Sequence, residues 1–178
     1  MLSRIGGLLL TIGSLVAVFL VVLVTGGTAV GLGGPEVNGQ YVVAYFLLIG
    51  AGTAAVALGA TAPFGTLGFR LATANISVGS LLLAVSGVGG ESTAILAIIG
   101  LLFIAVGLQA VGAILVLRRG GSRWTGAGML VGLACTVVGT IGPQPLAYVG
   151  IGLVLGSVAA LGILAFRAGS LRPSLAST

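Results

Sequence analysis

The charged residues of this chain stand far apart and leave five long runs that carry no charge. Seven arginines and two glutamates are the only charged side chains among its 178 residues. A helix needs about 20 apolar residues to cross a hydrocarbon core about 30 Å thick. The five runs, residues 5–35, 37–69, 71–90, 92–117 and 124–166, all meet that length. Because 58% of the residues are hydrophobic and only 5% are charged, the sequence predicts an integral membrane protein rather than a soluble domain.

The last run is too long for one helix and is interrupted near its middle. Pro143 and Pro145 stand there, and proline removes a backbone donor and fixes φ, so a turn is favoured over a continuous helix. The prediction is an all-α membrane protein. Residues 1–167 are expected to form a single six-helix transmembrane domain, and residues 168–178 a short disordered cytoplasmic tail. The predicted helices are residues 5–28, 41–62, 71–88, 93–117, 124–141 and 146–166.

The arginines predict which end of the helices faces the cytoplasm. With six helices, all arginines fall on one side, while Glu36, Glu91 and the proline turn fall on the other. Cytoplasmic loops carry an excess of basic residues, so both termini are expected in the cytoplasm. The alternative is a cleaved secretory signal ending near Ala29, although its apolar stretch is longer than such signals usually have. The arginines are Arg4, Arg70, Arg118, Arg119, Arg123, Arg167 and Arg172.

The even-numbered helices show the pattern of an internal repeat. When they are aligned on the arginine that ends each of them, one position is glycine in all three helices: Gly59, Gly107 and Gly156. The pattern predicts three two-helix hairpins in parallel orientation. The alternative is a chance match, which a chain rich in glycine, alanine and leucine makes easy.

Glycine is the most informative residue type, with 33 copies. In lipid, helices associate by close approach of their backbones, which small residues permit. Gly128 and Gly132 form such a pair in the fifth helix, and Gly152 and Gly156 form one in the sixth. We expect these glycines to pack helices within the chain, with a dimerisation face as the alternative.

Two polar side chains are predicted near the middle of the membrane. Gln109 precedes Arg118 by nine residues, which is about 13 Å along a helix, and Thr136 stands at a similar depth. A buried amide there needs a hydrogen-bonding partner. We therefore expect Gln109 to point into the bundle and to bond a neighbouring helix rather than a ligand.

The residues that are missing exclude several chemistries. There is no histidine, and Cys135 is the only cysteine, so haem, iron–sulfur and zinc sites built from this chain alone are not expected. No ionisable residue lies within a predicted helix, whereas coupled transport usually needs one. The arginines do not form the basic stripe of a nucleic-acid-binding protein. We predict no catalytic, cofactor-binding or metal-binding residue.

The sequence favours a non-catalytic membrane protein, either a scaffold or an accessory subunit of a membrane complex. Its expected partners are the lipid bilayer and either another membrane protein or a second copy of the chain. The alternative is a small channel or facilitator for a neutral or lipophilic solute. An intramembrane enzyme is the least favoured class. The use of arginine alone, with abundant glycine, alanine and valine, indicates the cell membrane of a prokaryote.

Overall fold

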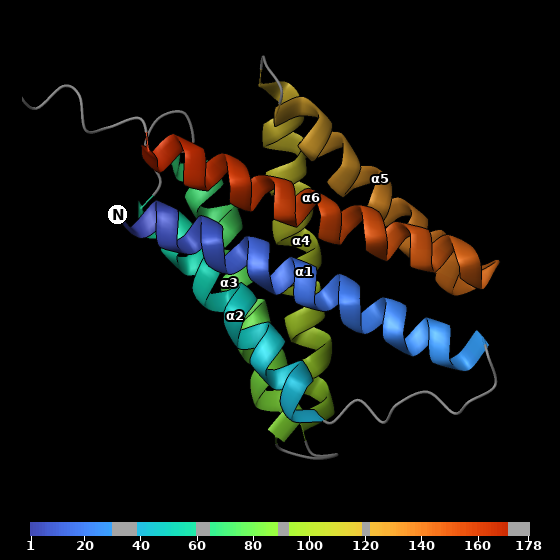
Figure 1. The fold of residues 1–178 in the computed structure, drawn as a ribbon. Coiled ribbons are helices and arrows are strands. Elements are labelled where there is room, and N and C mark those ends of the chain that lie inside the picture. Colours follow the sequence, from blue (N-terminus) through green and yellow to red (C-terminus); the bar gives the residue numbers. More distant parts are fainter. Residues whose placement is uncertain (30–38, 60–64, 89–92, 119–121, 171–178) are drawn as a thin grey trace, which may run out of the picture.

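The computed structural model describes residues 1–29, 39–59, 65–88, 93–118 and 122–170, which form six helices (Figure 1). The predicted all-α class is confirmed, and each predicted helix has its counterpart. The predicted tail begins too early, because the last helix continues through Ser170, and residues 171–178 lie outside the described residues. The helices are α1 Leu2–Ala29, α2 Gly39–Gly59, α3 Leu67–Val88, α4 Ala94–Leu117, α5 Ser122–Ile141 and α6 Gln144–Ser170.

Five of the helices are long and apolar enough to cross a membrane. They are α1, α3, α4, α5 and α6. The apolar part of α2 that the structure describes, Val43–Gly59, is shorter. By length and composition, this is the fold of an all-α membrane protein.

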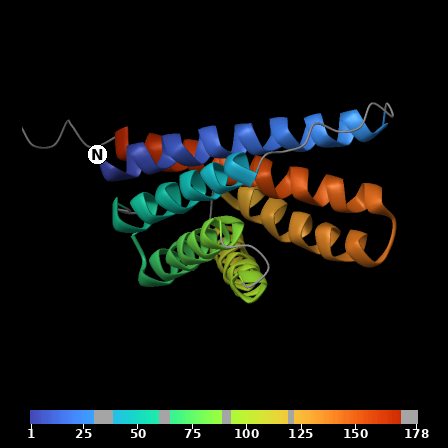
Figure 2. The same ribbon diagram turned by 90° about the horizontal axis from the view of Figure 1, so that it is seen from below.

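The helices form a closed ring. Each helix packs against its neighbours in the chain, and α1 closes the ring by packing against α6. Figure 2 shows α1 and α6 side by side, and the ring continues from α1 through α2, α3, α4 and α5 back to α6. The ring splays toward one end, where α2, α3 and α4 run together in one direction and α1, α5 and α6 run in another (Figure 1).

Glycine backbones meet where the helices of the ring cross. A methyl group added at Gly79 would lie 2.5 Å from the carbonyl oxygen of Gly100, and one at Gly100 would lie 2.8 Å from that of Gly79. Real side chains essentially never approach so closely, so any larger residue would push the helices apart. The same reciprocal contact recurs at four other interfaces, through the pairs Gly6–Gly52, Gly112–Gly126, Gly132–Gly150 and Gly7–Gly162.

The remaining interface, between α2 and α3, is joined by a hydrogen bond. The Ser77 hydroxyl donates to the Gly50 carbonyl oxygen over 2.8 Å. Two other polar side chains of α3, Thr73 and Ser80, are fully buried and donate to carbonyl groups of their own helix. These polar residues of α3 therefore face the protein interior, where their hydroxyl groups find partners.

The core lies inside the ring and draws a side chain from every helix. Its fully buried members include Leu10, Val56, Phe69, Val111, Leu115, Met129 and Leu161. Large apolar side chains also cover the outside: Trp124, Leu117 and Ile141 are each more than four-fifths exposed. An apolar outer surface is what a bilayer, rather than water, solvates.

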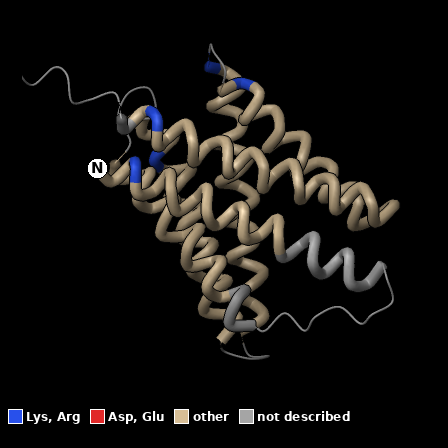
Figure 3. The backbone as a smooth tube through the Cα atoms, viewed as in Figure 1, with Lys and Arg blue, Asp and Glu red and all other residues tan. Residues whose placement is uncertain are grey.

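The described arginines gather toward one end of the bundle. Figure 3 shows them at the ends of helices on the side that holds the N-terminus. There the Arg118 guanidinium donates to the Thr66 hydroxyl over 3.3 Å, and the Arg123 side chain donates to the Arg118 carbonyl over 2.8 Å. Glu36 and Glu91 lie outside the described residues. The cytoplasmic orientation of the arginine end stays a prediction of the positive-inside rule.

Candidate functional site

Two of the four predicted packing glycines lie between α5 and α6. A methyl group added at Gly132 would stand 2.8 Å from the Gly150 carbonyl oxygen. One added at Gly128 would collide with the Ser157 hydroxyl. A larger residue at Gly132 would meet the backbone of α6 and require a shift of that helix, whereas at Gly128 a rotation of the Ser157 side chain would make room.

The other two glycines, Gly152 and Gly156, lie elsewhere than expected. Apart from the adjacent residues and the backbone of α6 itself, no atom of the described chain lies within 4 Å of a methyl group added at either position. The reason is the register of α6, which turns by about 100° per residue. Gly150 faces α5, so Gly152, two residues later, points to the opposite side. A stripe of small residues identified this helix as a packing helix but did not identify its contacting face.

Thr136 lies at the α5–α6 contact, as a polar group within the bundle. Its hydroxyl donates to the Gly132 carbonyl of its own helix over 2.8 Å. A methyl group added at Gly150 would meet the Thr136 hydroxyl oxygen at 2.5 Å, so the two helices touch at this point. The hydroxyl is satisfied locally.

The prediction that Gln109 points into the bundle is wrong. Its side chain is exposed, in a groove of about 630 Å³ on the outside of the ring between α4 and α5. No hydrogen bond links its amide to another residue of the described chain. The groove is lined by Ala105, Gln109 and Ala113 of α4 and by Leu130, Leu133, Ala134, Val137 and Val138 of α5.

A small cavity of about 110 Å³ lies inside the ring. Its lining is mainly apolar and includes the hydroxyl-bearing residues Tyr45, Thr53 and Ser80. Thr53 and Ser80 donate to carbonyl groups of their own helices. One water occupies about 30 Å³ of liquid, so the cavity has room for a few waters or a very small solute.

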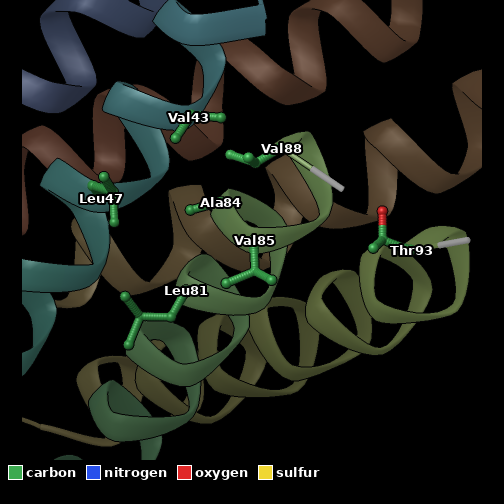
Figure 4. A pocket seen from close by; sticks show the side chains of 7 residues that line it. All are labelled: Val43, Leu47, Leu81, Ala84, Val85, Val88 and Thr93. Carbon is green, nitrogen blue, oxygen red and sulfur yellow. The ribbon is translucent and has the colours of Figure 1, made fainter. Parts of the chain in front are cut away.

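A second outer groove, of about 460 Å³, lies between the ends of α2 and α3 that are far from the arginines (Figure 4). Val43 and Leu47 of α2 face four residues of α3 across it, and Thr93 stands at its far side. The Thr93 hydroxyl donates to the Ser86 carbonyl over 2.9 Å. The rest of the lining is aliphatic, which suits lipid chains. The four residues of α3 are Leu81, Ala84, Val85 and Val88.

The described side chains offer little for catalysis or metal binding. Among them, no three His, Cys, Asp or Glu residues come together. Cys135 is half-buried in α5 and forms no disulfide. Apart from the guanidinium groups at the arginine end and the Cys135 thiol, the polar side chains of the described helices are amides and hydroxyls, which bind by hydrogen bonds.

The fold thus defines a class, an all-α protein with helices suited to a bilayer, and a candidate site, the groove that holds Gln109. In comparisons with known proteins, no family model, curated protein or solved structure matches the chain.

Proposed function

We propose that this chain is a non-catalytic scaffold or accessory subunit of a membrane complex. In this proposal all six helices cross the cell membrane of a prokaryote, with both termini in the cytoplasm. The chain contributes a rigid helical surface to which another membrane protein, or a second copy, binds laterally.

The exposed amide of Gln109 is the observation that carries the proposal. It stands about 13 Å along α4 from Arg118, within the length that a bilayer about 30 Å thick covers. An amide in hydrocarbon without a partner costs several kcal/mol. The described chain supplies no partner, so the partner is expected from another molecule in the membrane.

The packing of the ring supports the same proposal. Backbones touch at the helix crossings, and a wide pathway would need those contacts to open. Surfaces that are held rigidly lose little conformational entropy on binding, which favours a scaffold role.

A facilitator for a small neutral solute is the second candidate, favoured by the cavity inside the ring. In that case Thr53 and Ser80 would offer hydroxyl groups along the path. Leu10, Ile49 and Leu108 also line the cavity, so a solute would have to displace aliphatic side chains to pass.

Purification in mild detergent tests the scaffold proposal. We expect the tagged chain to be recovered with a membrane protein partner at a fixed ratio, or as an oligomer, and Gln109→Leu to lose that partner. Gln144→Leu is the matched control, because Gln144 is an exposed amide at the start of α6. A wild-type chain that is monomeric and carries solute flux in vesicles containing nothing else would replace the scaffold with the facilitator.

A further inference from the structure

The outer face of α4 combines small residues with an amide. Ala105, Gln109 and Ala113 follow one another at four-residue spacing, so they share one side of the helix. α5 forms the opposite wall of the groove with aliphatic side chains, of which Val137 is 60% exposed and Val138 is 54% exposed. Alanine on either side of an amide lets another helix approach closely enough to bond it.

Lipid could fill this groove but would leave the Gln109 amide without a hydrogen-bonding partner. Acyl chains fill an aliphatic groove, but they have neither a donor nor an acceptor for the amide. A helix that carries an amide at the same depth supplies both. The occupant that fits is therefore a transmembrane helix with a polar residue at the level of Gln109.

We propose that this occupant is α4 of a second copy of the same chain, in a two-fold symmetric dimer. The amide of Gln109 has one carbonyl oxygen and one NH₂ group, so two such amides can each donate to the other. In a two-fold dimer, identical residues near the axis meet. Two copies inserted in the same orientation carry Gln109 at the same depth in the membrane. An unrelated partner need not carry a polar residue at that depth.

The proposed dimer is also consistent with the shape of the surface. α4 lies between the Gln109 groove and the Asn75 groove, so it forms a ridge with a groove on each side. Two-fold symmetry therefore seats each α4 in the groove of the other copy. This inference rests on the proposed lateral assembly and names its partner.

The other flank of α4 provides the contrast. Asn75 of α3 lies in a smaller groove of about 310 Å³ with Leu102, Phe103 and Val106. A methyl group added at Gly107 would lie 3.0 Å from the backbone nitrogen of Ile76, so Asn75 and Gln109 lie within about a turn of one level. The Asn75 groove is half the size of the Gln109 groove, and α4 has no small-residue stripe there.

The experiment measures dimerisation of the purified full-length chain in lipid vesicles, by energy transfer between labelled copies over a range of chain-to-lipid ratios. We expect the wild type to dimerise, and Gln109→Leu to weaken the dimer about sevenfold. That change corresponds to two hydrogen bonds of about 0.6 kcal/mol each. Ala113→Leu, which blocks close approach, should have a larger effect. Asn75→Leu should leave the dimer unchanged, and helical content should be the same in all variants.

Crosslinking provides a second measurement. In a Cys135→Ala background, Ala113→Cys should form a disulfide-linked dimer on oxidation, because symmetry brings the two copies of this position together. Ile163→Cys, on the exposed face of α6, should not.

Three results would overturn the second-copy proposal. They are a wild-type chain that is monomeric at every ratio, a dimer that Gln109→Leu leaves intact, and a dimer that Asn75→Leu weakens equally. A different membrane protein that binds in a Gln109-dependent manner would overturn this inference and leave the scaffold function standing. Dimerisation that depends on Gln109, together with solute flux through this chain alone, would support the second-copy inference and overturn the scaffold function.

Discussion

At the scale of single residues, two buried serines differ in what their hydroxyl groups contact. Ser77 donates across the α2–α3 interface to Gly50. Ser14 of α1 is fully buried, and its hydroxyl oxygen has no hydrogen-bond partner in the described part of the chain. A buried polar group without a partner lowers stability, whereas a satisfied one raises it modestly.

The corresponding alanine variants should therefore differ in stability. Ser77→Ala is expected to lower the unfolding free energy in detergent by about 0.6 kcal/mol, the average for such bonds between membrane helices. Ser14→Ala is expected to leave it unchanged or to raise it by about 1 kcal/mol. Titration with a denaturing detergent measures both. Equal destabilisation by the two variants would mean that Ser14 has a partner in the folded protein.

Residue positions along each helix could be predicted from the sequence, but the side of the helix could not. The spacing from Arg118 gave the position of Gln109 along α4. A side chain that faces lipid and one that faces the core are both usually apolar, so hydrophobic periodicity marks no inner face on such a helix. The exposure of Gln109 and the outward direction of Gly156 become visible only when the ring is assembled.

At the scale of helices, charge and proline marked the ends of α4 and α5, whereas Arg70 and Arg167 lie within α3 and α6 rather than at their ends. α4 ends at Leu117, directly before Arg118, and α5 ends at Ile141, just before Pro143. The pairing of glycines between helices was not predictable, because it depends on the register of two helices at once. Of the three glycines aligned by the proposed repeat, Gly59 and Gly107 contact the backbone of the preceding helix and Gly156 does not. The repeat itself stays a prediction.

The difference between Gly132 and Gly156 gives a test of the α5–α6 contact. Gly132→Leu should force the helices apart and lower stability by about 1–3 kcal/mol, the usual effect of overpacking. Gly156→Leu adds the same side chain to an open face of the neighbouring helix and should leave the melting temperature in detergent unchanged. A loss of stability in Gly156→Leu that matches the loss in Gly132→Leu would show that α6 packs in another register.

At the scale of the whole molecule, the sequence predicted the six helices that the structure describes but not the closure of the ring. Alternating directions follow from the loops, whereas the contact between α1 and α6 joins opposite ends of the chain. It depends on Gly7 and Gly162, whose reciprocal contact no local pattern indicates. Because the ring closes, the surface left for partners is its outside. This is why the exposed amide of Gln109, within the length of α4, carries the functional proposal.

The orientation of the ring in the membrane can be tested with single cysteines. Gly39 begins α2 at the end away from the arginines, and Ser122 begins α5 beside Arg123. Because basic residues are retained in the cytoplasm, Gly39→Cys should react in intact cells with a thiol reagent that cannot cross membranes. Ser122→Cys should react only after the cells are permeabilised. Both changes are made in a Cys135→Ala background, which should itself stay unlabelled. Labelling of both positions from the same side would reject the six-span topology.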